Sequence, residues 1–155
     1  MKLAEHSYSA RITWTGNLGA GTASYRSYSR DHRVEADGPG ELLGSADPTF
    51  HGSTDRWNPE QLLLAAVAQC HMLSYLHVAV SAGVVVTGYS DDAVGSMRLN
   101  PDGSGEFTGI VLRPRVRLED PLQASLADSL HQRAHELCFI ARSVAFPVTH
   151  EPASS

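Results

Sequence analysis

The 155-residue sequence lacks any run of Lys or Arg, and its formal net charge is -5. Nucleic acids and anionic membrane surfaces are bound largely through clustered positive charge, so neither is indicated as a partner. The N-terminus also lacks an apolar stretch followed by a small-residue cleavage site. We therefore expect no signal peptide and a cytoplasmic location, where permanent disulfides are uncommon.

Charged residues are missing from one long central stretch, because residues 61–82 contain no Asp, Glu, Lys or Arg. This length could cross a bilayer. The polar residues inside it, Gln69, His71, Ser74 and His77, would be costly in lipid and favour a central helix of a soluble protein instead. Such an apolar helix would leave too much apolar surface on a monomer, which predicts a homodimer.

The rest of the composition is that of an ordinary globular chain, with 42% hydrophobic and 19% charged residues and no internal repeat. It predicts one domain over residues 1–155. Alternating polarity predicts a strand at 7–14, and a second strand is expected around 23–36. Residues 38–57 are rich in Gly, Pro, Asp and Ser, which is typical of a long ordered loop or a short extra strand with turns.

Two helices are predicted. The first begins at Asn58-Pro59-Glu60, because Asn caps free N–H groups, Pro suits the first turn and Glu suits the positive end of the helix dipole. Gly83 ends it. The remaining expected elements are strands at 84–90, 94–99 and 106–118, a second helix from about Asp120 to Cys138, a strand at 143–149 and a loose tail at 152–155. This order describes an α+β domain.

The sequence has only two cysteines, Cys70 within the long apolar helix and Cys138 at the end of the second helix. A buried free cysteine commonly behaves as a small hydrophobic residue. A permanent structural disulfide is disfavoured by the expected compartment, so two thiols that meet there are typical of a catalytic or redox-sensing pair.

The surroundings of both cysteines favour chemistry. The run from Asn58 to His71 resembles the central helix of the OsmC/Ohr family, in which an Asn-Pro-Glu helix start stands ten residues ahead of a peroxidatic cysteine. Glu60 and Cys70 keep that spacing. The run Ala134 to Ile140, which contains Cys138, is similar to the place of the family's resolving cysteine. Weaker similarities are Trp14-Thr15-Gly16, the Gly-Thr pair at 21–22, Ser-Arg-Asp-His at 29–32 and Cys-His-Met-Leu at 70–73.

This resemblance implies an OsmC/Ohr-like fold with antiparallel sheets, two main helices and an intertwined homodimer with active sites at the subunit interface. It also implies a thiol-dependent peroxidase of oxidative or osmotic stress defence. Cys70 attacks an organic hydroperoxide, an alcohol leaves, and Cys138 converts the resulting sulfenic acid to a disulfide. No bound cofactor or metal is implied, but an external dithiol reductant, of lipoyl type or another small thiol, is required. Leu73, Tyr75 and Leu76 near Cys70 suit an alkyl or lipid hydroperoxide.

A reactive thiolate needs a nearby cation, because the helix dipole fades within the first turn and Cys70 lies far beyond it. The resemblance implies an arginine from the second strand region, held by Glu60. Arg26, Arg30 and Arg33 all lie in that region. We favour Arg30, which stands in the Ser-Arg-Asp-His run.

Two alternatives remain open. His131, His135 and Cys138 are spaced i, i+4 and i+7 on one predicted helix and could bind zinc, although the usual short paired Cys/His spacings are absent. The chain could also be a ligand-binding stress protein of the same fold with little turnover. A pure binding module has no need of both thiols, which argues against the second alternative.

Overall fold

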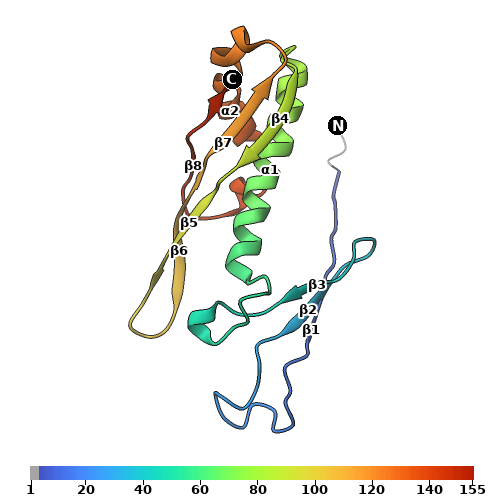
Figure 1. Cartoon of the computed structure of the whole chain (residues 1–155), viewed down its shortest axis with the longest axis vertical. Coiled ribbons are helices and arrows are strands. Elements are labelled where there is room, and N and C mark those ends of the chain that lie inside the picture. The colour runs from blue at the N-terminus through green and yellow to red at the C-terminus, as the bar shows by residue number, and fades with distance from the viewer. Residues whose placement is uncertain (1–3) are drawn as a thin grey trace. The chain divides into compact units, whose positions relative to one another are not determined.

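The structure is a computed structural model that describes residues 4–155 (Figure 1). The chain forms two compact units, one that ends at Leu62 and one that comprises Leu63–Ser155. A single domain over residues 1–155 therefore stays a prediction.

The first unit contains a three-stranded antiparallel sheet in the order β1-β2-β3. Its strands are β1 (Arg11–Trp14), β2 (His32–Glu35) and β3 (Leu42–Gly44). The predicted second strand is wrong before His32, because turns occupy residues 19–27. The Asn17 side chain accepts hydrogen bonds from the N–H groups of Gly19 and Gly21, and both glycines have positive φ angles that a strand does not allow.

The predicted ordered loop contains β3 and a short 3-10 helix, η1 (Pro48–Phe50). The Asp47 side chain caps η1 by accepting from the N–H of Thr49 at 2.7 Å. Trp57 then joins β3: its N–H donates to the Leu43 carbonyl, and its own carbonyl accepts from the N–H of Ser45. These bonds fix the segment directly before the long helix.

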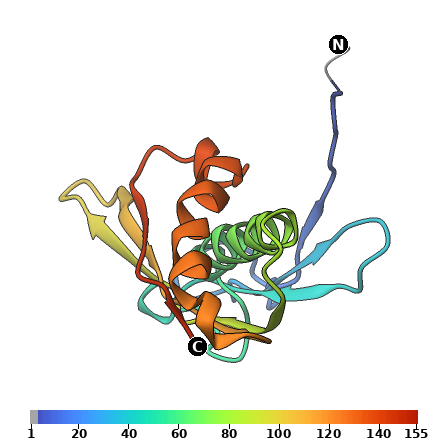
Figure 2. The same ribbon diagram turned by 90° about the horizontal axis from the view of Figure 1, so that it is seen from above.

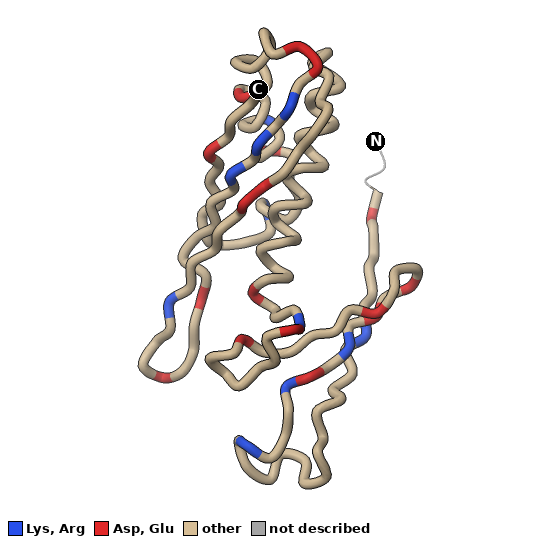
Figure 3. The backbone as a smooth tube through the Cα atoms, in the orientation of Figure 1, with Lys and Arg blue, Asp and Glu red and all other residues tan. Residues whose placement is uncertain are grey.

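The long helix α1 (Pro59–Ser81) begins where the sequence predicts. Asn58 Oδ1 accepts from the N–H of Gln61 at 2.8 Å, and Gln61 Oε1 accepts from the N–H of Asn58 at 3.1 Å, so the two residues cap the helix reciprocally. Gly83, with φ 70°, lies beyond its end. After the first turn α1 carries no charged residue, as Figure 3 shows. Among the described residues, α1 is the single helix that is long and apolar enough to cross a membrane, judged by length and composition alone.

The second unit is built on two three-stranded sheets, ordered β4-β7-β9 and β5-β6-β8. Strand β4 (Val86–Asp91) is followed after two residues by β5 (Val94–Leu99), and β6 (Gly105–Leu112) is followed after Arg113 by β7 (Pro114–Leu118). The single strand predicted at 106–118 is thus two strands. Pro114 has no N–H, and the N–H of Arg113 donates to the Asp91 carboxylate at 2.7 Å instead of to a strand.

The second helix, α2 (Ala124–Leu137), follows a 3-10 turn, η2 (Pro121–Gln123), and a further 3-10 turn, η3 (Ala141–Ser143), comes after it. Two parallel strands close the sheets: β8 (Val148–His150) pairs with β6, and β9 (Ala153–Ser154) pairs with β7. The strand predicted at 143–149 starts too early. The predicted loose tail is also wrong, since the N–H of Leu118 donates to the Ser155 carbonyl at 2.8 Å.

Within the second unit, α2 lies beside α1 and the sheets (Figure 2). One apolar core joins Tyr75 and Ala79 of α1 to Val116 of β7 and Ala127 of α2, and the Tyr75 hydroxyl donates to the Ala127 carbonyl at 3.1 Å. A second core, formed by Val67, Ile110 and Leu112, packs α1 on β6. These contacts fix the part of α1 that carries Cys70.

Candidate thiol site

The second unit brings the two cysteines together. Cys70 is half-buried on α1, Cys138 is fully buried directly after α2, and both are free thiols. Two hydrogen bonds hold Cys138: its N–H donates to the His135 carbonyl at 3.2 Å, and its Sγ accepts from the N–H of Ala141 at 3.5 Å. A strand-like backbone at Cys138 ends α2 and turns the side chain inward.

The two thiols differ in their surroundings. Burial raises the pKa of Cys138 to about 11, and the neighbouring Cys70 side chain adds to the increase. Cys138 is therefore a protonated thiol at neutral pH and a weak nucleophile. Cys70 is the more accessible of the pair. This difference in accessibility and pKa suits an order of reaction in which Cys70 reacts first and Cys138 second.

Cys70 opens onto an apolar depression of about 410 Å³. Its lining residues are Cys70, Leu73, Ser74 and His77 of α1 and Leu137 and Phe139 from the end of α2. Of the three wall residues that the sequence suggested, Leu73 lines the depression. Tyr75 instead is fully buried in the core. Leu137 and Phe139 were missed, because they reach Cys70 only through the packing of α2 on α1.

Glu60 lies in the first turn of α1, within the first unit. Its Oε2 atom is buried and has no hydrogen-bond partner. A buried carboxylate oxygen is normally paired, so this atom is suited to receive a donor from a cation. The ion pairs found among the described residues do not include Glu60.

Arg30, the favoured arginine, is held within its own loop. Its guanidinium carbon lies 4.4 Å from the ring centre of Tyr25 and 4.2 Å from that of Tyr28. The same group donates to the carbonyls of Tyr25 at 2.7 Å and Tyr28 at 2.8 Å. Both stacking and hydrogen bonding therefore fix its position. Arg30 and Cys70 belong to different units, so contact between them stays a prediction.

The other arginines occupy different surroundings. Arg33 pairs with Glu41 at 3.7 Å, and Arg26 is exposed. Arg56, which the sequence interpretation did not consider, pairs with Asp31 at 3.4 Å and lines a small depression beside the start of α1. Its position directly before Trp57 and the Asn-Pro-Glu helix start was the feature of the sequence that could have marked Arg56 as a further candidate arginine.

The alternative zinc site finds no support in the geometry. The ring of His131 is fully buried, and its Nδ1 is hydrogen-bonded to His71 Nε2 at 2.9 Å. Over residues 4–155, no group of three or more His, Cys, Asp or Glu side chains could hold a metal ion. The residues His131, His135 and Cys138 thus share a helix end but do not form a donor set.

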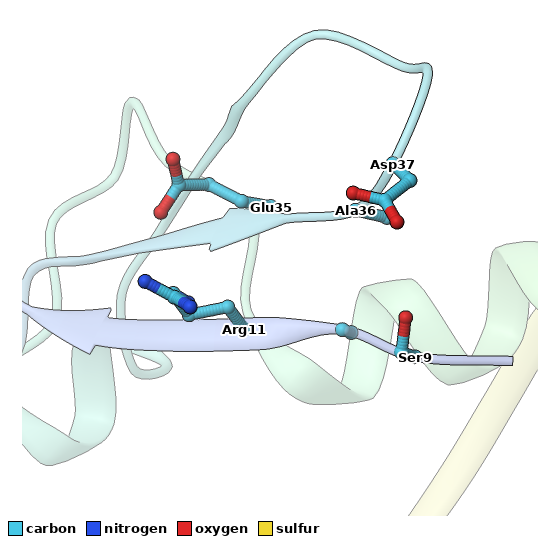
Figure 4. Close-up of a pocket in the computed structure, with 6 residues that line it drawn as sticks. Ser9, Arg11, Glu35, Ala36 and Asp37 are labelled. Atoms are coloured by element: carbon cyan, nitrogen blue, oxygen red, sulfur yellow. The ribbon is translucent and has the colours of Figure 1, made fainter.

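A further depression, of about 470 Å³, lies in the first unit on β1 and β2. Ser9, Arg11, Glu35 and Asp37 are among its lining residues, and Arg11 and Glu35 stand opposite one another on the paired strands (Figure 4). Its lining contains no thiol. The depression at Cys70 is therefore the better candidate for chemistry.

Comparison with known proteins identifies the family. Residues 51–152, well over half of the chain, match the OsmC family, described as OsmC-like protein. The chain belongs to the OsmC family. An OsmC-like protein of unknown function from Vibrio cholerae is 34% identical, with a TM-score of 0.83 over 96% of this chain and 99% of the other. The resemblance inferred from the helix start and the two cysteines is thereby confirmed, as is the α+β OsmC/Ohr-like fold.

More distant structures share the fold. An organic hydroperoxide resistance protein OsmC from Legionella pneumophila is 22% identical, with a TM-score of 0.71 over 99% of both chains. An organic hydroperoxide resistance protein from Elizabethkingia anophelis is 18% identical, with a TM-score of 0.70 over 98% of this chain and 97% of that one. The comparison with curated proteins gives no match.

Proposed function

We propose that this OsmC-family chain is a thiol-dependent peroxidase that reduces organic hydroperoxides to alcohols during oxidative or osmotic stress. One observation carries the proposal: a half-buried Cys70 opens onto an apolar depression, with the buried Cys138 thiol beside it. The names of the Legionella and Elizabethkingia structures agree with a role in resistance to organic hydroperoxides.

In the first step the Cys70 thiolate attacks the distal peroxide oxygen. The O–O bond breaks, the alkoxide takes up a proton and leaves as alcohol, and Cys70 becomes a sulfenic acid. In the second step Cys138 attacks the Cys70 sulfur. An S–S bond forms, and the thiol proton leaves with the sulfenic hydroxyl as water. An external dithiol, of lipoyl type or another small thiol, then reduces the disulfide and is itself oxidised.

The walls of the depression favour an apolar peroxide. Leu73, Leu137 and Phe139 offer hydrocarbon surface close to Cys70, whereas the polar wall residues are Ser74 and His77. Burial of an alkyl or lipid chain there is favourable at roughly 25 cal/mol per Å² of apolar surface, and hydrogen peroxide has no such surface to bury. We therefore assign alkyl or lipid hydroperoxides as substrates.

The cation that activates Cys70 is proposed to come from a second copy of the chain. Glu60 stands ten residues before Cys70 on α1, which is about 15 Å along a helix axis. Ten residues also turn the two side chains to different sides of the helix, which disfavours the contact of one guanidinium with both groups of the same helix. Glu60 and Arg30 of one chain would then serve Cys70 of the other, in the homodimer expected from the sequence.

The exposed apolar residues on and next to α1 support the proposal that a second copy of the chain packs there. Leu73 is 60% exposed and Val80 78% exposed on α1, and Phe139 after α2 is 78% exposed. Single exposed apolar residues are common, but these lie on or next to an uncharged helix and would be covered in a dimer.

Steady-state peroxide consumption tests the proposed function. With dihydrolipoamide as reductant, we expect the protein to consume cumene hydroperoxide with a kcat/KM at least tenfold above that for hydrogen peroxide. The Cys70→Ser protein should show no turnover with either peroxide. Equal turnover by the wild-type and Cys70→Ser proteins would refute the proposal, and tight peroxide binding without consumption would favour the ligand-binding alternative.

A further inference from the structure

Four histidines that are scattered along the sequence meet inside the second unit. His71 comes from α1, His131 and His135 come from α2, and His150 comes from β8. The ring centre of His150 lies 5.7 Å from that of His71, 5.9 Å from that of His131 and 6.0 Å from that of His135. His71 and His131 have no exposed surface at all. This four-histidine cluster joins the three elements around the thiol pair.

The cluster is poorly supplied with hydrogen bonds. His71 Nε2 and His131 Nδ1 lie 2.9 Å apart, and their ring planes differ by 8°, so the two rings meet edge to edge with one nitrogen donating. His71 Nδ1, His131 Nε2 and His135 Nδ1 are buried without a partner. Buried polar atoms are usually paired, so three unpaired ring nitrogens in one place are exceptional.

Among residues 4–155, no carboxylate offsets the effect of burial on His71 or His131, whose charged neighbours are the other histidines. On the surrounding elements, Asp128 accepts from the Ser154 hydroxyl and Glu151 pairs with Arg113. Asp91 accepts from the Arg113 N–H through one oxygen and keeps the other buried without a partner, and Glu136 pairs with Arg133 and also interacts with His135. The other neighbours are neutral aromatic residues, with Tyr75 stacked 4.1 Å from the ring of His131 and Tyr89 packed against Tyr75.

The buried rings of His71 and His131 are therefore neutral in the folded unit. Burial lowers the pKa of His71 to about 3, and the neighbouring His131 contributes in the same direction. Burial also lowers the pKa of His131 to about 4, and it lowers the pKa of His150. A proton can be accepted readily only after the cluster separates and its rings reach water.

The same two helices hold the thiols. His71 directly follows Cys70 on α1, and the carbonyl of His135 accepts the hydrogen bond from the N–H of Cys138. Separation of α2 from α1 at the cluster would therefore move Cys138 away from Cys70.

We propose that the four-histidine cluster makes the pairing of the two thiols acid-sensitive: protonation in mild acid releases α2 and β8 from α1, so that Cys138 no longer reaches oxidised Cys70. This inference rests on the proposed peroxidase function for its chemistry. In acid, Cys70 is still oxidised to the sulfenic acid, but the S–S bond does not form.

The direction of the effect follows from linkage. His71, His131 and His150 each have a pKa below the ordinary value of 6.5 when buried, so the closed state is fully favoured well above pH 6.5 and is weakened as the pH falls below it. At pH 5.5 the release of His71 or of His131 favours the open state by about tenfold, and the release of both by up to about a hundredfold.

Two readouts at pH 7.5 and 5.5, in the presence of a chelator, test the proposal. After one equivalent of cumene hydroperoxide, dimedone trapping and intact mass give the ratio of Cys70–Cys138 disulfide to Cys70 sulfenic acid. Hydrogen exchange of residues 124–137 and 148–150, corrected for the intrinsic effect of pH, reports the opening of the cluster. For the wild type, we expect the disulfide ratio to fall at least tenfold at pH 5.5 and the corrected exchange to rise at least tenfold.

The variant His71→Asn/His131→Phe removes both fully buried rings and retains an aromatic ring against Tyr75. It should show less than a threefold change in corrected exchange, and its disulfide ratio should fall at least tenfold less than that of the wild type, because only the lower thiolate fraction of Cys138 remains to slow resolution. His6→Gln, on an exposed residue, should behave as the wild type. If the double variant does not fold, His150→Gln, at a half-buried position, should reduce the change severalfold.

Equal pH responses in the wild type and in these cluster variants would overturn the proposal. Absence of both sulfenic acid and disulfide at either pH would instead reject the peroxidase function, and hydrogen exchange would still decide whether the cluster opens in acid.

Discussion

The buried thiol of Cys138 lies beside the half-buried thiol of Cys70, and burial raises the pKa of Cys138 to about 11. The pair is therefore asymmetric before any peroxide arrives. Cys70 has access to the apolar depression, while Cys138 remains protonated and enclosed. This asymmetry agrees with the proposal that Cys70 reacts with the peroxide and Cys138 resolves the oxidised sulfur.

The apolar wall should determine which peroxides react. Phe139→Ser removes an exposed ring from the depression, so we expect the KM for cumene hydroperoxide to rise about threefold to tenfold, with little change in kcat. The rate with hydrogen peroxide should stay within twofold, because that substrate does not need the wall. Leu122→Ser, at a 93% exposed position on η2, serves as the control. An equal loss with both peroxides would show that Phe139 acts on the fold and not on substrate choice.

Glu60 and its arginine should affect rate more than stability. We expect Glu60→Ala and Arg30→Ala each to lower kcat/KM at least tenfold, because the Cys70 thiolate loses its cation or the cation loses its position. Thermal unfolding followed by circular dichroism checks that each variant is folded. If Arg30→Ala is fully active while Arg26→Ala, Arg33→Ala or Arg56→Ala is not, the arginine has been assigned wrongly and the thiol mechanism stands.

Mixed dimers test whether the two chains share each site. Neither Glu60→Ala nor Cys70→Ser should have appreciable activity alone. Co-expression with two different affinity tags isolates a dimer with one chain of each kind. If Glu60 serves the Cys70 of its partner, this dimer contains one complete site and should recover up to about half of the wild-type activity per dimer. An inactive mixed dimer would place both residues in one chain, and a purely monomeric protein in sedimentation would exclude the dimer itself.

The stability of the folded chain should decline in mild acid. His71 and His131 have lowered pKa values in the folded unit, of about 3 and about 4, so the unfolded state binds more protons between these values and 6.5. The stability that the neutral rings provide is complete well above pH 6.5 and is lost as the pH falls. Between pH 7.5 and 5.5 we expect a loss of about 2 kcal/mol in urea unfolding, which His71→Asn/His131→Phe should reduce by more than half.

Much of the fold could be predicted from local sequence. Asn58 and Gln61 determine where α1 begins, and Gly83 determines where it stops, because capping depends on residues close in sequence. The strand predicted at 106–118 was not broken at Pro114, because its division depends on the distant Asp91 carboxylate. The C-terminal strand β9 was missed for a similar reason, since two residues become a strand only through pairing with β7.

The residues of the candidate site that belong to a sequence motif could be predicted, and the residues that reach it only through packing could not. The family resemblance pointed to Cys70, Cys138 and Glu60, whereas Leu137 and Phe139 enter the depression only through tertiary packing. The Ser-Arg-Asp-His run singled out Arg30 but could not show its surroundings, because Arg30 lies in a loop and stacks on Tyr25 and Tyr28. The four-histidine cluster could not be predicted from the sequence, because its members lie on three elements that meet only in the folded unit. Two of them, His131 and His135, were considered only as zinc ligands.

Intact-mass measurement after stoichiometric cumene hydroperoxide at pH 7.5 tests whether Cys70 is oxidised first and is then resolved by Cys138. The wild type should lose two hydrogens through a Cys70–Cys138 disulfide, and Cys138→Ser should gain one oxygen and, with excess peroxide, a second. Cys70→Ser should not change. An oxygen adduct on Cys70→Ser but not on Cys138→Ser would reverse the two roles, and an unchanged mass in the wild type would contradict the peroxidase account.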